Sequence, residues 1–162
     1  MSNSAMTAPV TRRRMGFLLG GVGLATANAQ PKQSASAIHQ EIDFKAAAAR
    51  VYEALLDAKQ FSAFTHTPAE IDTRPGGAFK LFGGQVEGRH VELNPGHRIV
   101  QAWRSAAWPS GVYSIVHFEL TPHAGGSRIV FDHTGFPDGE QEHLSEGWPL
   151  MYWEPLRKYL DA

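Results

Sequence analysis

The apolar and polar positions of this chain follow a helical period over one long stretch at its C-terminal end. Between Asp138 and Leu160, apolar side chains recur at steps of three and four residues, and charged side chains fall mostly between them. This spacing places the apolar side chains on one stripe of a helix, which at 1.5 Å per residue is roughly 30 Å long. The predicted stripe consists of Leu144, Trp148, Met151, Tyr152, Leu156 and Tyr159.

Two prolines, Pro149 and Pro155, interrupt this helical pattern. Each removes a backbone N–H and crowds the carbonyl group four residues earlier, which here belongs to Ser145 and Met151. Pro149 could instead be the first residue of the main helix, where the missing N–H costs nothing. We expect one bent helix.

Most of the chain between residues 38 and 134 shows the two-residue period of strands. Residues 38–44 alternate apolar and polar side chains, whereas residues 45–64 are rich in helix formers and predict two helical segments with a break near Lys59. Five further strands, separated by turns that contain glycine or proline, are expected at residues 79–82, 85–93, 98–104, 112–121 and 128–134. Consecutive hairpins followed by a helix predict an α+β fold, with a curved antiparallel β-sheet around the long C-terminal helix.

The first 29 residues show the three zones of a signal peptide. No acidic residue precedes Glu41, and a basic segment that includes Arg12 and Arg13 is followed by an apolar, glycine-rich run that is too short to span a bilayer comfortably. The Arg12–Arg13 pair resembles a twin-arginine signal. A disordered basic tail is the alternative interpretation.

Small residues after this run fit a cleavage site between Ala27 and Ala29. The sequence therefore predicts a signal peptide at residues 1–29, a flexible linker at 30–37 and one domain at 38–162. The mature protein is expected in the periplasm or outside the cell, with no stable membrane insertion once the signal is removed.

The composition narrows the classes of function. The 162 residues suffice for one domain with a sizeable core. The net charge of −1 gives no electrostatic reason to expect nucleic acid as a partner. Cysteine is absent, which excludes disulfides, thiolate nucleophiles and cysteine-rich zinc sites.

The eight histidines show no HExxH motif or other paired metal-ligand spacing, so neither a metal nor a cofactor is expected. His117 and Glu119 share the face of a strand that is expected to meet solvent. Asp132 and His133 are adjacent, but neighbours on a strand point to opposite faces. Ser114 has only remote candidate bases, so the sequence predicts no nucleophile–base pair.

His133 is the histidine expected to reach the interior. It shares its side of the strand with Ile129 and Phe131, both apolar. Three interpretations stay open: a satisfied polar group of the core, a contact to a ligand, or a catalytic acid or base.

Four motifs resemble one family, named after the activator of the heat-shock-protein-90 ATPase, within the START-like superfamily of helix-grip folds. They are the glycine-flanked segment 76–88, the segment 94–104 with sequence NPGHRIVQAWR, the Trp108–Pro109 turn, and the segment 146–156 with sequence EGWPLMYWEPL. The resemblance covers roughly residues 38–161. It implies an elongated cavity between the sheet and the C-terminal helix, but no single activity, because the superfamily includes carriers, receptors, enzymes and co-chaperones.

The first functional hypothesis is an exported, non-enzymatic domain that binds a small hydrophobic or amphipathic ligand in this cavity. The residues expected to line it are Trp103, Phe118, Phe131, His133, Trp148 and Tyr152. One alternative is a cyclase/aromatase- or hydrolase-like enzyme that uses His133 as acid or base. Another is a co-chaperone-type interaction module. The export signal argues against this module, because the family's co-chaperone works in the cytosol and carries another domain N-terminally.

Overall fold

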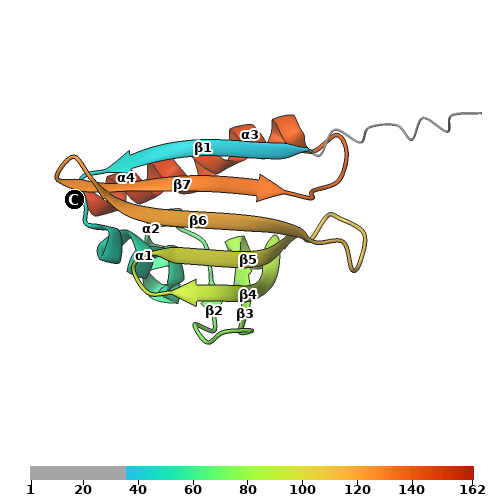
Figure 1. Cartoon of the computed structure of the whole chain (residues 1–162). Coiled ribbons are helices and arrows are strands. Elements are labelled where there is room, and N and C mark those ends of the chain that lie inside the picture. The colour runs from blue at the N-terminus through green and yellow to red at the C-terminus, as the bar shows by residue number, and fades with distance from the viewer. Residues whose placement is uncertain (1–35) are drawn as a thin grey trace, which may run out of the picture. The chain divides into compact units, whose positions relative to one another are not determined.

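The computed structural model describes residues 36–162, so the predicted signal peptide, with Arg12 and Arg13, lies outside the described residues. The described chain forms a seven-stranded antiparallel sheet with the strand order β1-β7-β6-β5-β4-β3-β2 (Figure 1). The strands are β1 (Ala37–Phe44), β2 (Glu70–Ile71), β3 (Ala78–Leu81), β4 (Val86–Asn94), β5 (Arg98–Ser105), β6 (Ser114–His123) and β7 (Gly126–Thr134). The α+β class and the curved antiparallel sheet are thus confirmed.

The helices lie together on one face of this sheet (Figure 1). Helices α1 (Ala48–Leu56) and α2 (Ala58–Thr65) are separated at Asp57, whose side chain caps α2 by accepting a 2.8 Å hydrogen bond from the backbone N–H of Gln60. The C-terminal helix consists of α3 (Gln141–Trp148), a π-helical segment (Pro149–Trp153) and α4 (Glu154–Leu160). The core lies between this layer and the inner face of the sheet.

The strand patterns place alternate residues of β6 and β7 in this core. Val116 and Phe118 of β6 are buried, as are Ile129, Phe131 and His133 of β7. β1, the first strand along the chain, pairs with β7, the last strand, so the first and last strands are neighbours in the sheet.

The predicted stripe of the C-terminal helix needs two corrections. The helix begins at Gln141 rather than Asp138. Met151 was assigned to the buried stripe but is 45% exposed, whereas Trp153, which was left off the stripe, is only 3% exposed.

The physical reason is the π-helical segment. Pro155 cannot donate to the carbonyl group four residues earlier, and the N–H of Glu154 bonds to the carbonyl of Pro149, five residues back. This wider turn rotates the following side chains about the helix axis, so Tyr152 and Trp153 both face inward.

Gln40 of β1 compensates for the other proline. Pro149 leaves the carbonyl of Ser145 without its usual helical donor, and the Gln40 side-chain amide donates to that carbonyl at 3.1 Å. The same side chain accepts a 2.6 Å hydrogen bond from the indole N–H of Trp153. One glutamine therefore attaches the bent part of the helix to the edge strand.

Candidate functional site: a pocket beside the C-terminal helix

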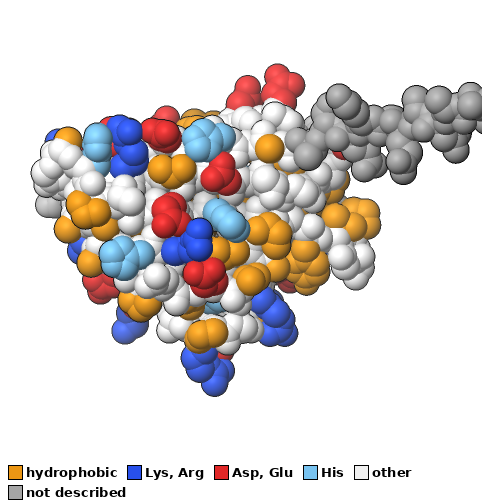
Figure 2. Space-filling model, viewed as in Figure 1, with side chains coloured by type: hydrophobic (Ala, Val, Ile, Leu, Met, Phe, Trp, Pro, Cys, Tyr) orange, Lys and Arg blue, Asp and Glu red, His pale blue; other side chains and the backbone are white. Residues whose placement is uncertain are grey.

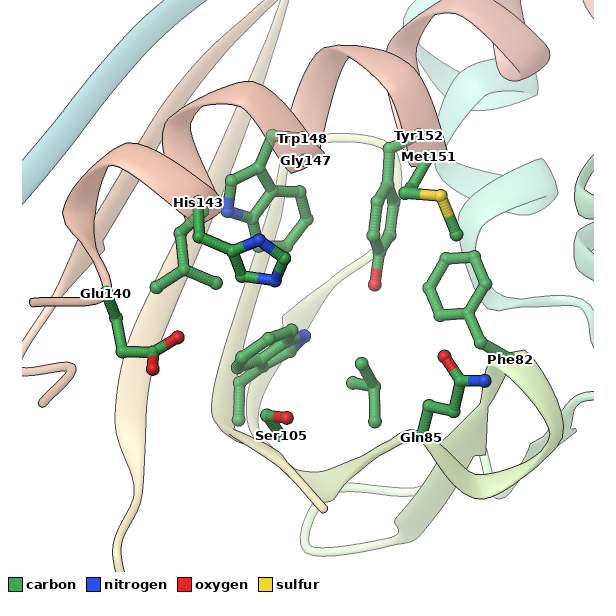
Figure 3. Close-up of a pocket in the computed structure, with 12 residues that line it drawn as sticks. Phe82, Gln85, Ser105, Glu140, His143, Gly147, Trp148, Met151 and Tyr152 are labelled. Carbon is green, nitrogen blue, oxygen red and sulfur yellow. The ribbon is translucent and has the colours of Figure 1, made fainter. Parts of the chain in front are cut away.

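The described part of the molecule contains a pocket of about 330 Å³ between the C-terminal helix and the β4–β5 side of the sheet (Figure 3). One wall is α3 with the π-helical segment, and the other is the 3-10 turn Phe82–Gly84 with the adjoining ends of β4 and β5. The apolar lining side chains are Phe82, Val86, Trp103, Leu144, Trp148 and Met151. The polar ones are Gln85, Ser105, Glu140, His143 and Tyr152.

The 3-10 turn presents Phe82 to this pocket. Phe82, Gly83 and Gly84 have φ angles of 54°, 66° and 92°, a left-handed conformation that glycine adopts without steric cost. The N–H of Gly83 bonds to the carbonyl of Pro68 at 2.9 Å, which holds the turn in place. Two consecutive glycines therefore let the chain reverse at the pocket edge.

Trp103 is held from behind by the loop that joins β5 and β6. The indole ring of Trp108 packs against that of Trp103 with centroids 5.4 Å apart. Arg104, which is only 8% exposed, donates to the carbonyl of Trp108 at 2.7 Å and to the carboxylate of Glu87. The buried guanidinium thus fixes the loop, and the loop fixes this wall of the pocket.

Two polar groups meet at the inner end of the pocket. The hydroxyl of Tyr152 points into the space (Figure 3). Burial raises the pKa of this phenol, and the nearby Trp103 indole partly opposes the rise. The indole N–H of Trp103 is buried and has no partner in hydrogen-bond geometry among the described residues. The inner end therefore holds a neutral phenol beside an unpaired donor.

Of the six residues predicted to line a cavity, Trp103, Trp148 and Tyr152 line this pocket. Phe118, Phe131 and His133 are buried in the core next to it, and they are not among the lining residues. Phe131 packs against Trp148 with ring centroids 4.3 Å apart, so these residues support the wall from behind. That any of the six binds a ligand stays a prediction.

Ser114 was expected to have only remote candidate bases, but the structure places a histidine beside it. The Nε2 atom of His133 lies 2.8 Å from the Ser114 hydroxyl oxygen. β6 and β7 are antiparallel, with Val116 opposite His133, so Ser114 is the diagonal neighbour of the histidine on the inner face. The register of two strands produces this pair, and the sequence does not reveal that register.

The hydrogen bonds around His133 determine its tautomer. The indole N–H of Trp148 can only donate, and it donates to Nδ1 of His133 at 3.1 Å. Nε2 therefore carries the proton and donates to Ser114, whose hydroxyl donates in turn to the carbonyl of Trp103 at 2.9 Å. Burial lowers the pKa of His133 to about 3.

This arrangement does not supply the base that the enzyme hypothesis assigned to His133. A neutral imidazole whose Nε2 carries a proton cannot accept the proton of Ser114, and its other nitrogen is occupied by Trp148. The network instead joins β5, β6, β7 and α3 through fully satisfied polar groups, which is the first of the three interpretations of His133.

The opposite face of the sheet carries several charged pairs. Figure 2 shows acidic, basic and histidine side chains interspersed over the strands. His39 bonds to Asp132 at 2.7 Å on this face, and Arg98 bonds to Glu119 at 2.8 Å. Within residues 36–162, no group of three or more potential ligands is placed to hold a metal ion. In the same residues, no helix has the length and apolar character needed to cross a membrane.

Comparison with known proteins places this fold in a family. The family described as "Activator of Hsp90 ATPase homolog 1-like protein" matches residues 45–161. The chain belongs to this family. The resemblance stated from the four sequence motifs is thereby confirmed.

Curated relatives are similar to the chain over about two thirds to three quarters of its length. The human activator of 90 kDa heat shock protein ATPase homolog 1 is 29% identical over 108 residues, which are 67% of this chain and 32% of that protein. An uncharacterised protein of Schizosaccharomyces pombe is 32% identical over 120 residues, or 74% of this chain and 36% of that protein. The chain thus spans about a third of the length of the curated relatives it matches.

The fold is shared with solved structures of the family. The crystal structure of an HSP90 activator from Plasmodium falciparum matches with a TM-score of 0.74 and 22% identity, over 78% of this chain and 96% of that chain. A match at this identity shows the fold alone.

Sequence reasoning missed part of the pocket wall. Phe82, Val86 and Leu144 carry ordinary core patterns, so nothing in their spacing separates them from packing residues. Gly147 could have indicated the pocket from the sequence, because a glycine inside a helix lowers its stability by about 1 kcal/mol relative to alanine and often has a packing or functional reason. A Cβ atom built at Gly147 meets nothing within 4 Å, and the residue borders the pocket.

Proposed function

We propose that this chain is an exported domain that holds a small, mostly apolar molecule in the pocket beside its C-terminal helix. The observation that carries the proposal is the inner end of the pocket, where Tyr152 and the unpaired indole N–H of Trp103 lie among aromatic walls. An unpaired buried donor costs about 1–3 kcal/mol, and a bound molecule whose acceptor completes the hydrogen bonds of Tyr152 and Trp103 recovers part of that cost.

The dimensions of the pocket support this proposal. A volume of about 330 Å³ lies at the lower end of the range of small-molecule sites, roughly 300–1,000 Å³. The apolar lining gives affinity through surface burial, at about 25 cal/mol per Å². The few polar groups would fix the orientation of the ligand.

The test uses a variant that fills the pocket without disturbing the core. Gly147→Phe places a ring where a Cβ meets no neighbour, whereas Gly147→Ala adds one methyl group at the same position. We expect Gly147→Ala to bind like the wild type and Gly147→Phe to bind nothing. Both variants should stay folded. Ser114→Trp is not a suitable variant for this purpose, because Ser114 is 1% exposed and belongs to the His133 network.

Binding is measured by thermal shift and tryptophan fluorescence with a panel of fatty acids, sterols and aromatic compounds. Trp103 and Trp148 line the pocket, so an occupant changes their emission. A ligand at one hundred times its Kd stabilises the folded state by about 2.7 kcal/mol. Native mass spectrometry of protein isolated from its host reports any molecule that remains bound. If the panel and the mass spectra both show no ligand, the ligand-binding proposal is refuted.

The export part of the proposal rests on residues 1–29, with Arg12 and Arg13 as the twin-arginine pair. Fractionation of cells that express the full chain tests it. A processed protein in the periplasm or the medium supports export, and a full-length protein in the cytoplasm contradicts it.

A second candidate function is binding to a chaperone, and the names of the relatives favour it. The human relative is called an activator of a heat-shock-protein ATPase. The test measures the ATPase rate of an Hsp90 chaperone with and without residues 38–162. A concentration-dependent change in that rate supports a co-chaperone role, and an unchanged rate at saturating domain removes it.

A further inference from the structure

We propose that the ligand of this pocket is a neutral, ring-containing molecule with a carbonyl-type acceptor at its buried end, and that the Tyr152 hydroxyl donates to that acceptor. This inference rests on the proposed ligand-binding function and names the chemical class that the pocket selects. It is carried by the position of three polar groups: the Tyr152 hydroxyl, the Trp103 indole N–H and the Glu140 carboxylate.

The direction of the hydrogen bond follows from the neighbour of Tyr152. An indole N–H can only donate, and that of Trp103 lies next to the phenol oxygen without reaching hydrogen-bond geometry. A small adjustment on binding lets Trp103 donate to the phenol oxygen. The phenol proton is then directed away from Trp103, toward the cavity. The group that meets it must be an acceptor.

The charge of the ligand follows from the lining. None of the residues that line the pocket is Lys or Arg, and its ionisable side chains besides Tyr152 are Glu140, at the edge, and His143 (Figure 3). A carboxylate or phosphate at the buried end would lose its hydration without a lysine or arginine as counter-charge, while Glu140 adds a charge of the same sign to the lining. Burial also keeps the phenol protonated, because it raises the pKa of Tyr152. A neutral donor therefore meets a neutral acceptor.

The walls favour a ring over a flexible chain. Phe82 and Trp148 each pack against Tyr152, with ring centroids 5.3 and 4.3 Å apart, so aromatic rings surround the phenol. Aromatic groups prefer offset or edge-to-face contacts with other rings. A planar ring system gains such contacts, while a free fatty acid would bring both a flexible chain and a charge.

The experiment compares three probes of similar shape by isothermal titration calorimetry. They are 2-acetylnaphthalene, which has a neutral carbonyl, 2-ethylnaphthalene, which lacks an acceptor, and 2-naphthoate, which is an anion. We expect the ketone to bind wild-type protein about five- to tenfold more tightly than the hydrocarbon, which is the range expected for one net hydrogen bond. The anion should bind more weakly than both.

Tyr152→Phe removes only the hydroxyl and should abolish the preference for the ketone without weakening the hydrocarbon. The matched control is Tyr159→Phe, a change on the same helix at a half-buried tyrosine outside the pocket lining. This control should keep the full preference. A melting curve of each variant verifies that it is folded, and the comparison of probes on wild-type protein stands without any variant.

Each outcome decides a different claim. Equal binding of ketone and hydrocarbon to the wild type, tightest binding of the anion, or a preference that survives in Tyr152→Phe overturns the inference and leaves the ligand-binding function intact. If none of the three probes binds, and the wider panel also fails, the proposed function is refuted and the inference with it.

Discussion

The buried His133 network predicts a specific dependence of stability on pH. Folding lowers the pKa of this histidine from 6.5 to about 3, because burial of the ring away from water disfavours its charged form. Between these two values the unfolded chain binds a proton that the folded protein does not. The resulting stability is therefore complete above pH 6.5 and is lost as the pH falls from 6.5 toward 3.

The magnitude follows from the same two pKa values. Between pH 7 and pH 4.5, this single histidine should lower the free energy of unfolding by about 2.5 kcal/mol. That is a large part of a typical domain stability of about 5–15 kcal/mol. Urea unfolding at a series of pH values measures this effect. The quantity compared is the slope of the free energy of unfolding against pH, in the wild type and in His133→Gln. The variant has a side chain that does not titrate, and its curve should be flatter by about 1.4 kcal/mol per pH unit at pH 5.

Ser114→Ala is the control for this experiment. It removes a hydrogen-bond partner of His133 and should lower the free energy of unfolding by about 1–3 kcal/mol at pH 7. The reason is that the buried N–H of His133 and the carbonyl of Trp103 both lose the serine hydroxyl as a partner. The titrating ring remains buried, so the wild-type slope should persist. Parallel pH curves for wild type and His133→Gln would refute the account of a buried neutral histidine.

Three further outcomes test the fold and the export signal. Trp148→Ala should lower the free energy of unfolding by roughly 3–5 kcal/mol, because it leaves a cavity at a buried site, whereas Arg157→Ala on the exposed side should lower it by less than about 1 kcal/mol. Similar melting temperatures for the two variants would show that the buried stripe is misplaced. Gln40→Ala should lower the free energy of unfolding in urea by about 1–3 kcal/mol, since Ser145 and Trp153 both lose a hydrogen-bond partner. The control is Gln141→Ala, which removes an exposed hydrogen bond to Ala37. Changing Arg12 and Arg13 to Lys should leave an unprocessed precursor in the cytoplasm, and normal processing on an immunoblot would remove the twin-arginine assignment.

Local features of this fold could be read directly from the sequence. The two-residue alternation of Ile129, Phe131 and His133 predicted that they share one face, and all three are buried. The same reasoning separated Asp132 from His133, and Asp132 indeed bonds to His39 on the other face. Such patterns succeed because strand geometry depends only on neighbouring residues.

The candidate site depended on contacts between distant segments. Ser114 and His133 meet only because β6 and β7 pair in one register, and a shift by one residue would turn Ser114 toward the opposite face. Gln40 holds the carbonyl of Ser145, which lies 105 residues later in the chain, and this bond belongs to the same bend that buries Trp153 in place of Met151.

The sequence by itself therefore determined the order and type of the elements, most of the core and the family, since these follow from local periodicity and from motifs. The tertiary structure decided which aromatic side chains border a cavity and which only pack behind it. It also decided the protonation of His133, because a tautomer depends on partners that three strands and a helix bring together.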